Sequence, residues 1–74
     1  MRIKLLALEE EGADWLAFEG KDRYGRLRIE IDRRWAAAQG HDLATDKAAQ
    51  RAVARRASQL PCDIVGRTRV VRVK

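Results

Sequence analysis

The feature that most restricts the fold of this chain is a strict alternation of apolar and charged side chains over residues 26–32. Leu27, Ile29 and Ile31 occupy every second position, and a charged residue stands on either side of each. Successive side chains of a strand point to opposite faces, so this pattern predicts a strand with one buried face. The aromatic-rich stretch 15–19 also favours a strand. Gly25, between the two, can adopt a positive φ, which predicts an antiparallel hairpin.

Both ends of the chain also carry strand-like sequences. Residues 3–8 are mainly apolar, and the acidic, glycine-containing stretch 9–13 is expected to end this first strand. Residues 67–74 contain three valines and predict a last strand. Residues 64–66 either extend that strand backwards or form a small hairpin with it.

A short helix is predicted directly after the hairpin, over residues 33–39. Asp32 occupies its N-cap position, and Gly40 is a suitable C-terminal stop. Trp35 is its apolar anchor. The helix would make about two turns.

A longer helix is predicted over residues 46–60. Thr45 can cap it, Asp46 suits its first turn, and Pro61 follows its end. Small apolar side chains recur along it at helical spacing, which permits close packing on a sheet or a partner helix. These apolar residues are Ala49, Val53, Ala57 and Leu60, with Ala52 beside them.

Together these elements predict one small α+β domain over residues 1–74. An antiparallel sheet of three to four strands would pack on one or two helices, in the order β-β-β-α-α-β. A chain of 74 residues buries only about 60% of its unfolded surface, so its core is small. The residues expected to be buried together are Leu27, Ile29, Ile31, Trp35, Val53, Ala57, Leu60 and Val71.

Charge is divided unevenly along the chain. Residues 1–32 carry six Lys or Arg and eight Asp or Glu, a balance of −2, whereas residues 33–74 carry ten and three, a balance of +7. The two balances sum to the net charge of +5. A basic half on a small domain is typical of proteins that meet polyanions, and it is also common on solvated surfaces.

The second predicted helix carries the candidate nucleic-acid-binding site. Cations spaced at i, i+4 and i+8 line one stripe of a helix and can contact phosphates along a groove. A solvated helix face has the same pattern, so that alternative stays open, although the basic last strand adds weight to nucleic-acid contact. The candidate residues are Lys47, Arg51, Arg55 and Arg56.

The helix pair also suggests a helix-turn-helix, with the second helix in a DNA groove. However, the first helix is short, and the connection over residues 40–44 exceeds the usual three or four residues. A helix pair packed on a sheet is therefore favoured.

No pattern in the sequence predicts catalysis, a metal or a cofactor. Glu30 and Asp32 share a strand face, but arginines surround them, which is typical of a salt-bridged surface. The chain has one cysteine, Cys62, and one histidine, His41. These could form a thiolate–imidazolium pair, but nothing in the sequence brings them together. We expect a non-enzymatic protein without cofactors.

Membrane insertion is not expected either. The longest uninterrupted apolar run covers residues 5–8, far short of the roughly 20 residues that span a bilayer. The N-terminus does not have the pattern of a signal peptide, because three glutamates follow at 9–11. A cytoplasmic protein is the expectation.

A further pattern runs through the hairpin and the start of the first helix. It comprises Leu16-Ala17-Phe18-Glu19, Gly25, the alternating strand, and Ile31-Asp32-Arg33-Arg34-Trp35. It resembles a family of small proteobacterial domains of unknown function with V-x-F-x-A, a glycine turn, an alternating strand, and I-S-x-x-A-L before the helices. Asp32 replaces the family's serine, and Arg55-Arg56 resembles part of its second helix. The resemblance covers residues 15–57 and implies an architecture without a site.

Two classes of function remain open. The chain is expected to be a small bacterial nucleic-acid-binding or regulatory module that uses its basic C-terminal half. Alternatively, it is a protein-interaction adaptor or a homodimer without nucleic-acid contact. The small core, the terminal strands expected at sheet edges and the alanine-lined helix favour a second copy as partner. One continuous arginine patch would favour nucleic acid, and an exposed apolar patch would favour the adaptor.

Overall fold

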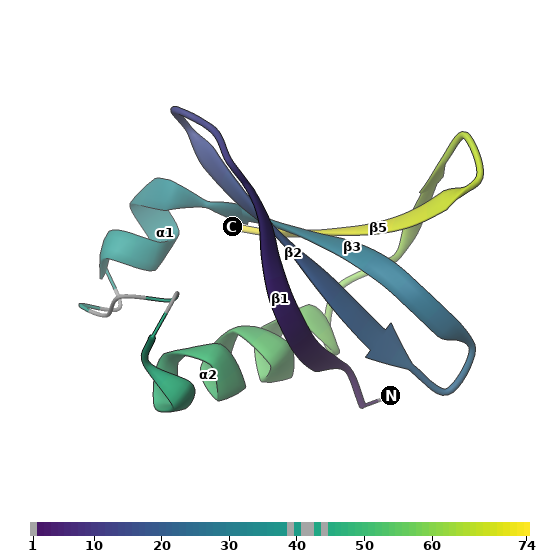
Figure 1. Cartoon of the computed structure of the whole chain (residues 1–74), viewed down its shortest axis with the longest axis horizontal. Helices are drawn as coiled ribbons and strands as arrows, with labels where there is room; N and C mark the ends of the chain where they lie inside the picture. Colours follow the sequence, from purple (N-terminus) through teal and green to yellow (C-terminus); the bar gives the residue numbers. More distant parts are fainter. Residues whose placement is uncertain (1, 39, 41–42, 44) are drawn as a thin grey trace.

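The computed structural model describes residues 2–38, 40, 43 and 45–74, which adopt an α+β fold (Figure 1). Its elements are β1 (Lys4–Glu11), β2 (Trp15–Asp22), β3 (Gly25–Asp32), α1 (Arg33–Ala38), α2 (Lys47–Ala57), β4 (Asp63–Val65) and β5 (Thr68–Val73). The strands of this described part form one sheet in the order β1-β2-β3-β5-β4.

The predicted fold class is confirmed, but the predicted sheet was wrong in two respects. The sheet is mixed rather than antiparallel, because β5 pairs parallel to β3. It has five strands rather than three or four, because the predicted alternative of a small hairpin before the last strand is the one that forms, with residues 63–65 as β4, the antiparallel partner of β5. β5 therefore lies inside the sheet, and β1 and β4 are its edges.

The predicted hairpin of β2 and β3 is confirmed, with Phe18 opposite Ile29 and Leu16 opposite Ile31. Gly25 follows the turn with a φ of 117°, a conformation that side chains disfavour. A carboxylate oxygen of Asp22 accepts a hydrogen bond of 2.9 Å from the backbone N–H of Tyr24, which closes the turn.

β1 is longer than predicted and runs through the glutamates that were expected to end it. Glu10 pairs with Ala17 and Glu11 with Leu16, so the chain turns only at Gly12. Charged side chains are compatible with this strand because it is a sheet edge with solvent beside it. Two register shifts, on either side of Leu8, bend β1 and interrupt its regular ladder.

Both helices begin at aspartates. Asp32 accepts hydrogen bonds from the N–H groups of Arg34 and Trp35, as predicted, and Gly40 follows α1 with a φ of 71°. α2 is capped by Asp46, which accepts hydrogen bonds from the N–H groups of its first turn. The prediction of Thr45 as cap was therefore wrong by one position. α2 also ends at Ala57, three residues earlier than expected.

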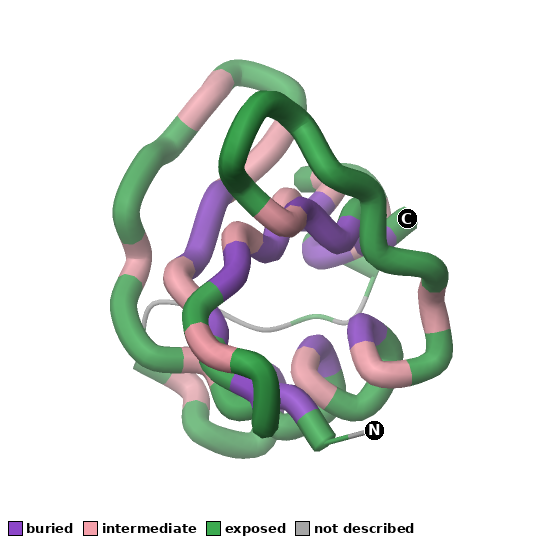
Figure 2. Tube along the Cα trace, turned by 90° about the vertical axis from the view of Figure 1, so that its right-hand side faces the viewer, coloured by how far each residue is buried: buried purple, intermediate pink, exposed green. Residues whose placement is uncertain are grey.

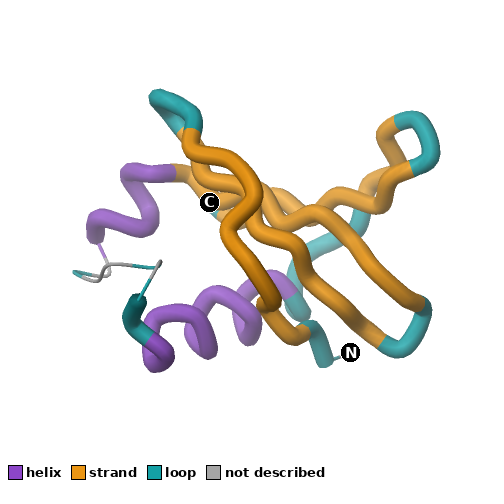
Figure 3. Tube along the Cα trace, viewed as in Figure 1, coloured by secondary structure: helices purple, strands orange, loops and turns teal. Residues whose placement is uncertain are grey.

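The core lies between the inward face of the sheet and the two helices. Side chains of β2, β3 and β5 form one buried cluster with Ala36 of α1 and with Ala49, Val53 and Ala57 of α2. α1 contacts β3, and α2 contacts β1 and β5, so the prediction of a sheet-backed helix pair is confirmed (Figure 3). Figure 2 shows that the buried parts of the strands and of α2 face one another.

Most of the predicted core is confirmed. The residues that are buried as expected are Leu27, Ile29, Ile31, Val53, Ala57 and Val71. Trp35 and Leu60 are only half-buried and pack against the edge of the cluster. Leu60 is less buried than predicted because it lies beyond the end of α2, where helical spacing no longer applies.

An ion pair with a buried carboxylate links two strands of the sheet. Asp22 has a side chain only 2% exposed, and both its oxygens accept hydrogen bonds of 2.9 Å from the Arg69 guanidinium. These bonds lower the pKa of Asp22 below its ordinary value, and they raise the pKa of Arg69. The pair joins the end of β2 to β5, which do not neighbour each other in the sheet.

Separate substitutions of Asp46, the observed N-cap, and Thr45, the predicted one, show which residue stabilises the start of α2. Asp46→Ala removes the acceptor for the first N–H groups of α2 and should lower the free energy of unfolding by about 1 kcal/mol. Thr45→Ala should leave it within about 0.5 kcal/mol of the wild type. Urea unfolding followed by circular dichroism measures both, and a larger effect at Thr45 would contradict the assigned cap.

The Asp22–Arg69 pair also predicts a pH dependence. Because folding lowers the pKa of Asp22, the pair's contribution to stability is complete above the unfolded value of about 4 and is lost as pH falls through the folded value. Asp22→Asn should therefore lower the melting temperature at pH 7, and its difference from wild type should shrink toward pH 2. A difference that stays constant over this range would show that Asp22 ionisation does not stabilise the fold.

Candidate functional site

The four cations predicted as a binding site all lie on the exposed side of α2. Ala49, Val53 and Ala57 take the opposite, sheet-facing side, so the charged stripe points outward. Among the residues that the structure describes, no carboxylate lies within ion-pairing distance of Lys47, Arg51, Arg55 or Arg56.

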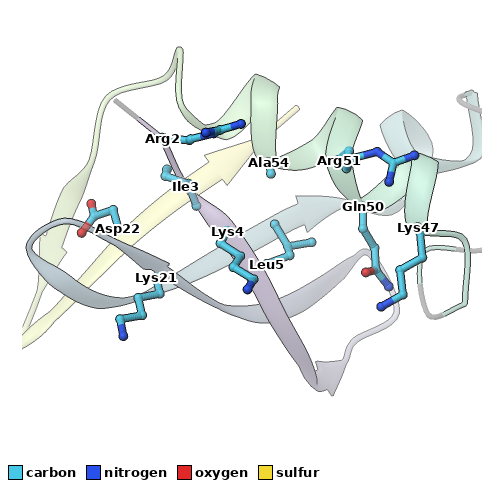
Figure 4. A pocket seen from close by; sticks show the side chains of 10 residues that line it. All are labelled: Arg2, Ile3, Lys4, Leu5, Lys21, Asp22, Lys47, Gln50, Arg51 and Ala54. Atoms are coloured by element: carbon cyan, nitrogen blue, oxygen red, sulfur yellow. The ribbon is translucent and has the colours of Figure 1, made fainter.

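A trough runs between this helix and the start of β1. One hollow of about 610 Å³ lies beside Lys47 and Arg51 and extends across to β1 and the end of β2 (Figure 4). A second hollow of about 560 Å³ lies farther along α2, beside Arg55. The two share four lining residues, so we treat them as one surface, the basic trough. The shared residues are Arg2, Ile3, Arg51 and Ala54.

Six cations line the basic trough, all of them exposed. Three of the predicted residues belong to it, whereas Arg56 lies on α2 but lines neither hollow. Three further cations come from the half of the chain whose overall balance is acidic, and sequence analysis missed them. The six are Arg2, Lys4, Lys21, Lys47, Arg51 and Arg55.

Hydrogen bonds through Ser58 hold the two walls of the trough together. The Ser58 hydroxyl accepts a bond of 3.1 Å from the backbone N–H of Ile3 and donates one of 2.8 Å to the Ala54 carbonyl. Residue 3 is thereby attached to the last turn of α2. At the other end of the trough, the Gln50 amide donates a 2.8 Å bond to the carbonyl of Leu43, which fixes that side chain.

The sheet side of the trough contains an unfavourable arrangement of charge. Lys4 lies directly opposite Lys21 in the β1–β2 pair, and Lys21 lies opposite Arg26 in the β2–β3 pair. Like charges at directly opposed positions destabilise a sheet. Arg26 contacts Glu19, but among the described residues neither lysine has a carboxylate partner. The fold thus places positive charge here without neutralising it.

Among the described residues, one carboxylate lines the trough, and it is already paired within the chain. Asp22 binds Arg69 through both oxygens, so its negative charge is neutralised within the chain. The other acidic residues of the N-terminal half lie elsewhere. Glu9, Glu10 and Glu11 are at the far end of β1, about 20 Å from Lys4 at the rise of an extended strand.

Four of the cations outside the trough are paired with carboxylates of the described residues: Arg26, Arg28, Arg69 and Arg72. Arg28 binds Glu10 and Glu30 and lies 5.2 Å from the centre of the Trp15 ring. Its pKa is raised by the hydrogen bond to Glu10 and further by Glu30. Arg72 also binds Glu30, at 3.1 Å.

This pairing reduces the positive charge that the last strand can contribute to a binding surface. Arg69 and Arg72 were expected to add to a basic surface, but each is neutralised by a carboxylate. Arg67 and Lys74 are exposed, and neither lines the basic trough. The concentration of unneutralised charge is therefore at the trough and not along β5.

Two other candidate residues from the sequence have structural roles. Glu30 accepts hydrogen bonds from two arginines, and Asp32 caps α1. Cys62 is exposed, and His41, its hypothetical partner, lies outside the described residues.

Within residues 2–38, 40, 43 and 45–74, no group of three potential metal-binding side chains occurs. No helix in that same set is long and apolar enough to cross a membrane.

Comparisons with other proteins leave the basic trough as the main guide to function. The resemblance of residues 15–57 to a small proteobacterial family stays a prediction. No family model, curated protein or solved structure matches this chain.

Proposed function

We propose that this protein binds nucleic acid non-enzymatically through the basic trough. The observation that supports this most directly is that one trough is lined by six exposed cations, namely Arg2 and residues of β1, β2 and α2. None of the six has a carboxylate partner among the described residues. A phosphate backbone would supply the missing negative charge along the whole length of such a surface.

The contacts would be mainly to phosphate and sugar. Arginine donates bidentate hydrogen bonds to phosphate, and lysine acts as a point charge. The trough has few uncharged side chains that can read base edges. The Gln50 amide already donates to Leu43 and the Ser58 hydroxyl is bonded within the chain, which leaves Gln59 as the exposed amide. Binding with little sequence specificity follows, as in proteins that recognise nucleic acid chiefly through its backbone.

A second candidate function is association with another copy or another protein through the β4 edge. Ile64 and Val65 are 75% and 53% exposed, and β4 pairs on one side only. Two earlier grounds for dimerisation do not apply, because β5 lies inside the sheet and Ala49 and Ala57 of α2 are buried within the chain. We favour nucleic acid, because β4 has only three residues and short edge strands discourage pairing.

The first prediction for this function concerns salt. If each of the six cations contacts one phosphate, a plot of log affinity against log salt concentration has a slope of about −5 for duplex DNA and about −4 for a single strand. The double change Arg51→Gln and Arg55→Gln should flatten the slope by about 2 on a duplex. Fluorescence anisotropy over a series of salt concentrations measures this slope.

The matched control is the double change Arg34→Gln and Arg67→Gln. It removes the same net charge from two exposed arginines outside the trough and should leave the slope nearly unchanged. Equal slopes for the two double variants would show that general positive charge, and not the trough, carries the binding. No binding even at low salt would reject the proposed function.

The second prediction links stability to binding at Lys21. Replacing it by glutamate puts a negative charge between the opposed Lys4 and Arg26, which should raise the free energy of unfolding by about 0.5 kcal/mol. The same change should weaken binding to nucleic acid, because it reverses a charge in the trough. Thermal unfolding and anisotropy measure the two effects on one variant.

The control for Lys21→Glu is Arg67→Glu, which changes net charge equally in the exposed β4–β5 turn. It should weaken binding less and should not stabilise the fold. If Lys21→Glu lowered stability, or stabilised the protein without affecting binding, the link between unneutralised charge and ligand binding would be refuted.

A further inference from the structure

The basic trough has an apolar floor as well as cationic walls. Ile3 is only 7% exposed, and with Leu5 and Ala54 it forms the strip between α2 and the sheet (Figure 4). Lys47, Arg51 and Arg55 lie on the helix side of this strip, and Arg2 lines both hollows. Lys4 and Lys21 also line the larger hollow, but strand alternation places their side chains on the sheet face opposite Ile3 and Leu5. The surface therefore offers a ligand an apolar strip beside a row of positive charge.

This combination distinguishes between forms of nucleic acid. In a duplex, the base faces are stacked inside and only phosphates, sugars and base edges are presented outward. A phosphate pressed onto an apolar floor would lose hydration without compensation. In a single strand the base faces are free, and single-strand-binding grooves combine a cationic track with surfaces that the bases lie on.

The spacing of the helix cations is consistent with one strand. Lys47, Arg51 and Arg55 follow each other at four-residue intervals, about 6 Å apart along the axis of α2. Such a row can accompany a single backbone along the trough, and Arg2 lines both hollows beside it.

We propose that the basic trough selects single-stranded over double-stranded nucleic acid, with bases resting on Ile3, Leu5 and Ala54 and phosphates held by the flanking cations. This inference rests on the proposed function and specifies its ligand. The floor is aliphatic, so base contact would come from burial of apolar surface, which is non-directional and should be tolerant of sequence.

The test uses the full chain and fluorescein-labelled oligonucleotides of about 12 nucleotides, a length in the range of single-strand-binding sites. One probe is an oligothymidine, one is a mixed-sequence strand, and the third is the duplex of that mixed strand. We expect both single strands to bind about tenfold more tightly than the duplex at the same salt concentration.

A pair of variants tests the floor itself. Ala54→Glu puts a carboxylate on the floor, whereas Ala52→Glu makes the same charge change at an exposed position of α2 outside the trough. Ala54→Glu should weaken single-strand binding about tenfold beyond Ala52→Glu, and the difference between the two variants should be smaller for the duplex. As a measurement independent of variant folding, oligothymidine added to the wild type should shift the NMR amide signals of Ile3, Leu5 and Ala54.

Each other outcome overturns the inference in a different way. Equal or tighter duplex binding, or equal effects of the two alanine variants, would refute single-strand selection and leave the proposed function standing. Absence of binding to every oligonucleotide at low salt would refute both. Dodecyl phosphate that shifts the same amide signals while oligothymidine does not would show that the trough takes a small amphipathic anion instead.

Discussion

The parallel pairing of β3 with β5 is the constraint on which the rest of the structure depends. Two parallel neighbours cannot be joined by a tight turn, so the chain between them must return along the sheet before β5 begins. The helices lie in this return segment, which is why both cover the inward face of the sheet. The same path brings α2 beside β1, where the Ser58 hydroxyl joins helix and strand. The basic trough is thus a product of the sheet topology.

Local patterns were sufficient to predict the elements but not their pairing. The alternation around Ile29, the glycine after the β2–β3 turn and the Asp32 cap are short-range features, and each has the predicted geometry. The direction of β5 could not be predicted, because a β-branched strand has the same composition whether its neighbour is parallel or antiparallel. Residues 9–11 were misjudged for a related reason: three glutamates are compatible with a strand only at an edge, and edge position is set by the whole sheet.

The candidate site was half predictable for similar reasons. Lys47, Arg51 and Arg55 share a helix face, and helical periodicity alone aligns them. Lys4 and Lys21 were missed because charge was summed over a segment that also contains the glutamates at the far end of β1. Their juxtaposition depends on the β1–β2 register, which two bulges shift. Conversely, the sequence does not reveal that Arg69 and Arg72 of β5 are neutralised, because their carboxylate partners come from β2 and β3.

β1 has one basic and one acidic end. Its first residues border the unneutralised cations of the trough, and its last residues are glutamates, of which Glu9 and Glu11 have no basic partner in the described part of the chain. Near a polyanion this arrangement favours approach with the basic end of β1 leading, before any contact is made. A larger fraction of encounters then begins in a productive orientation, so the association rate increases more than the lifetime of the complex does. For nucleic-acid binding of the kind proposed above, rapid capture and easy release are the expected kinetic outcome.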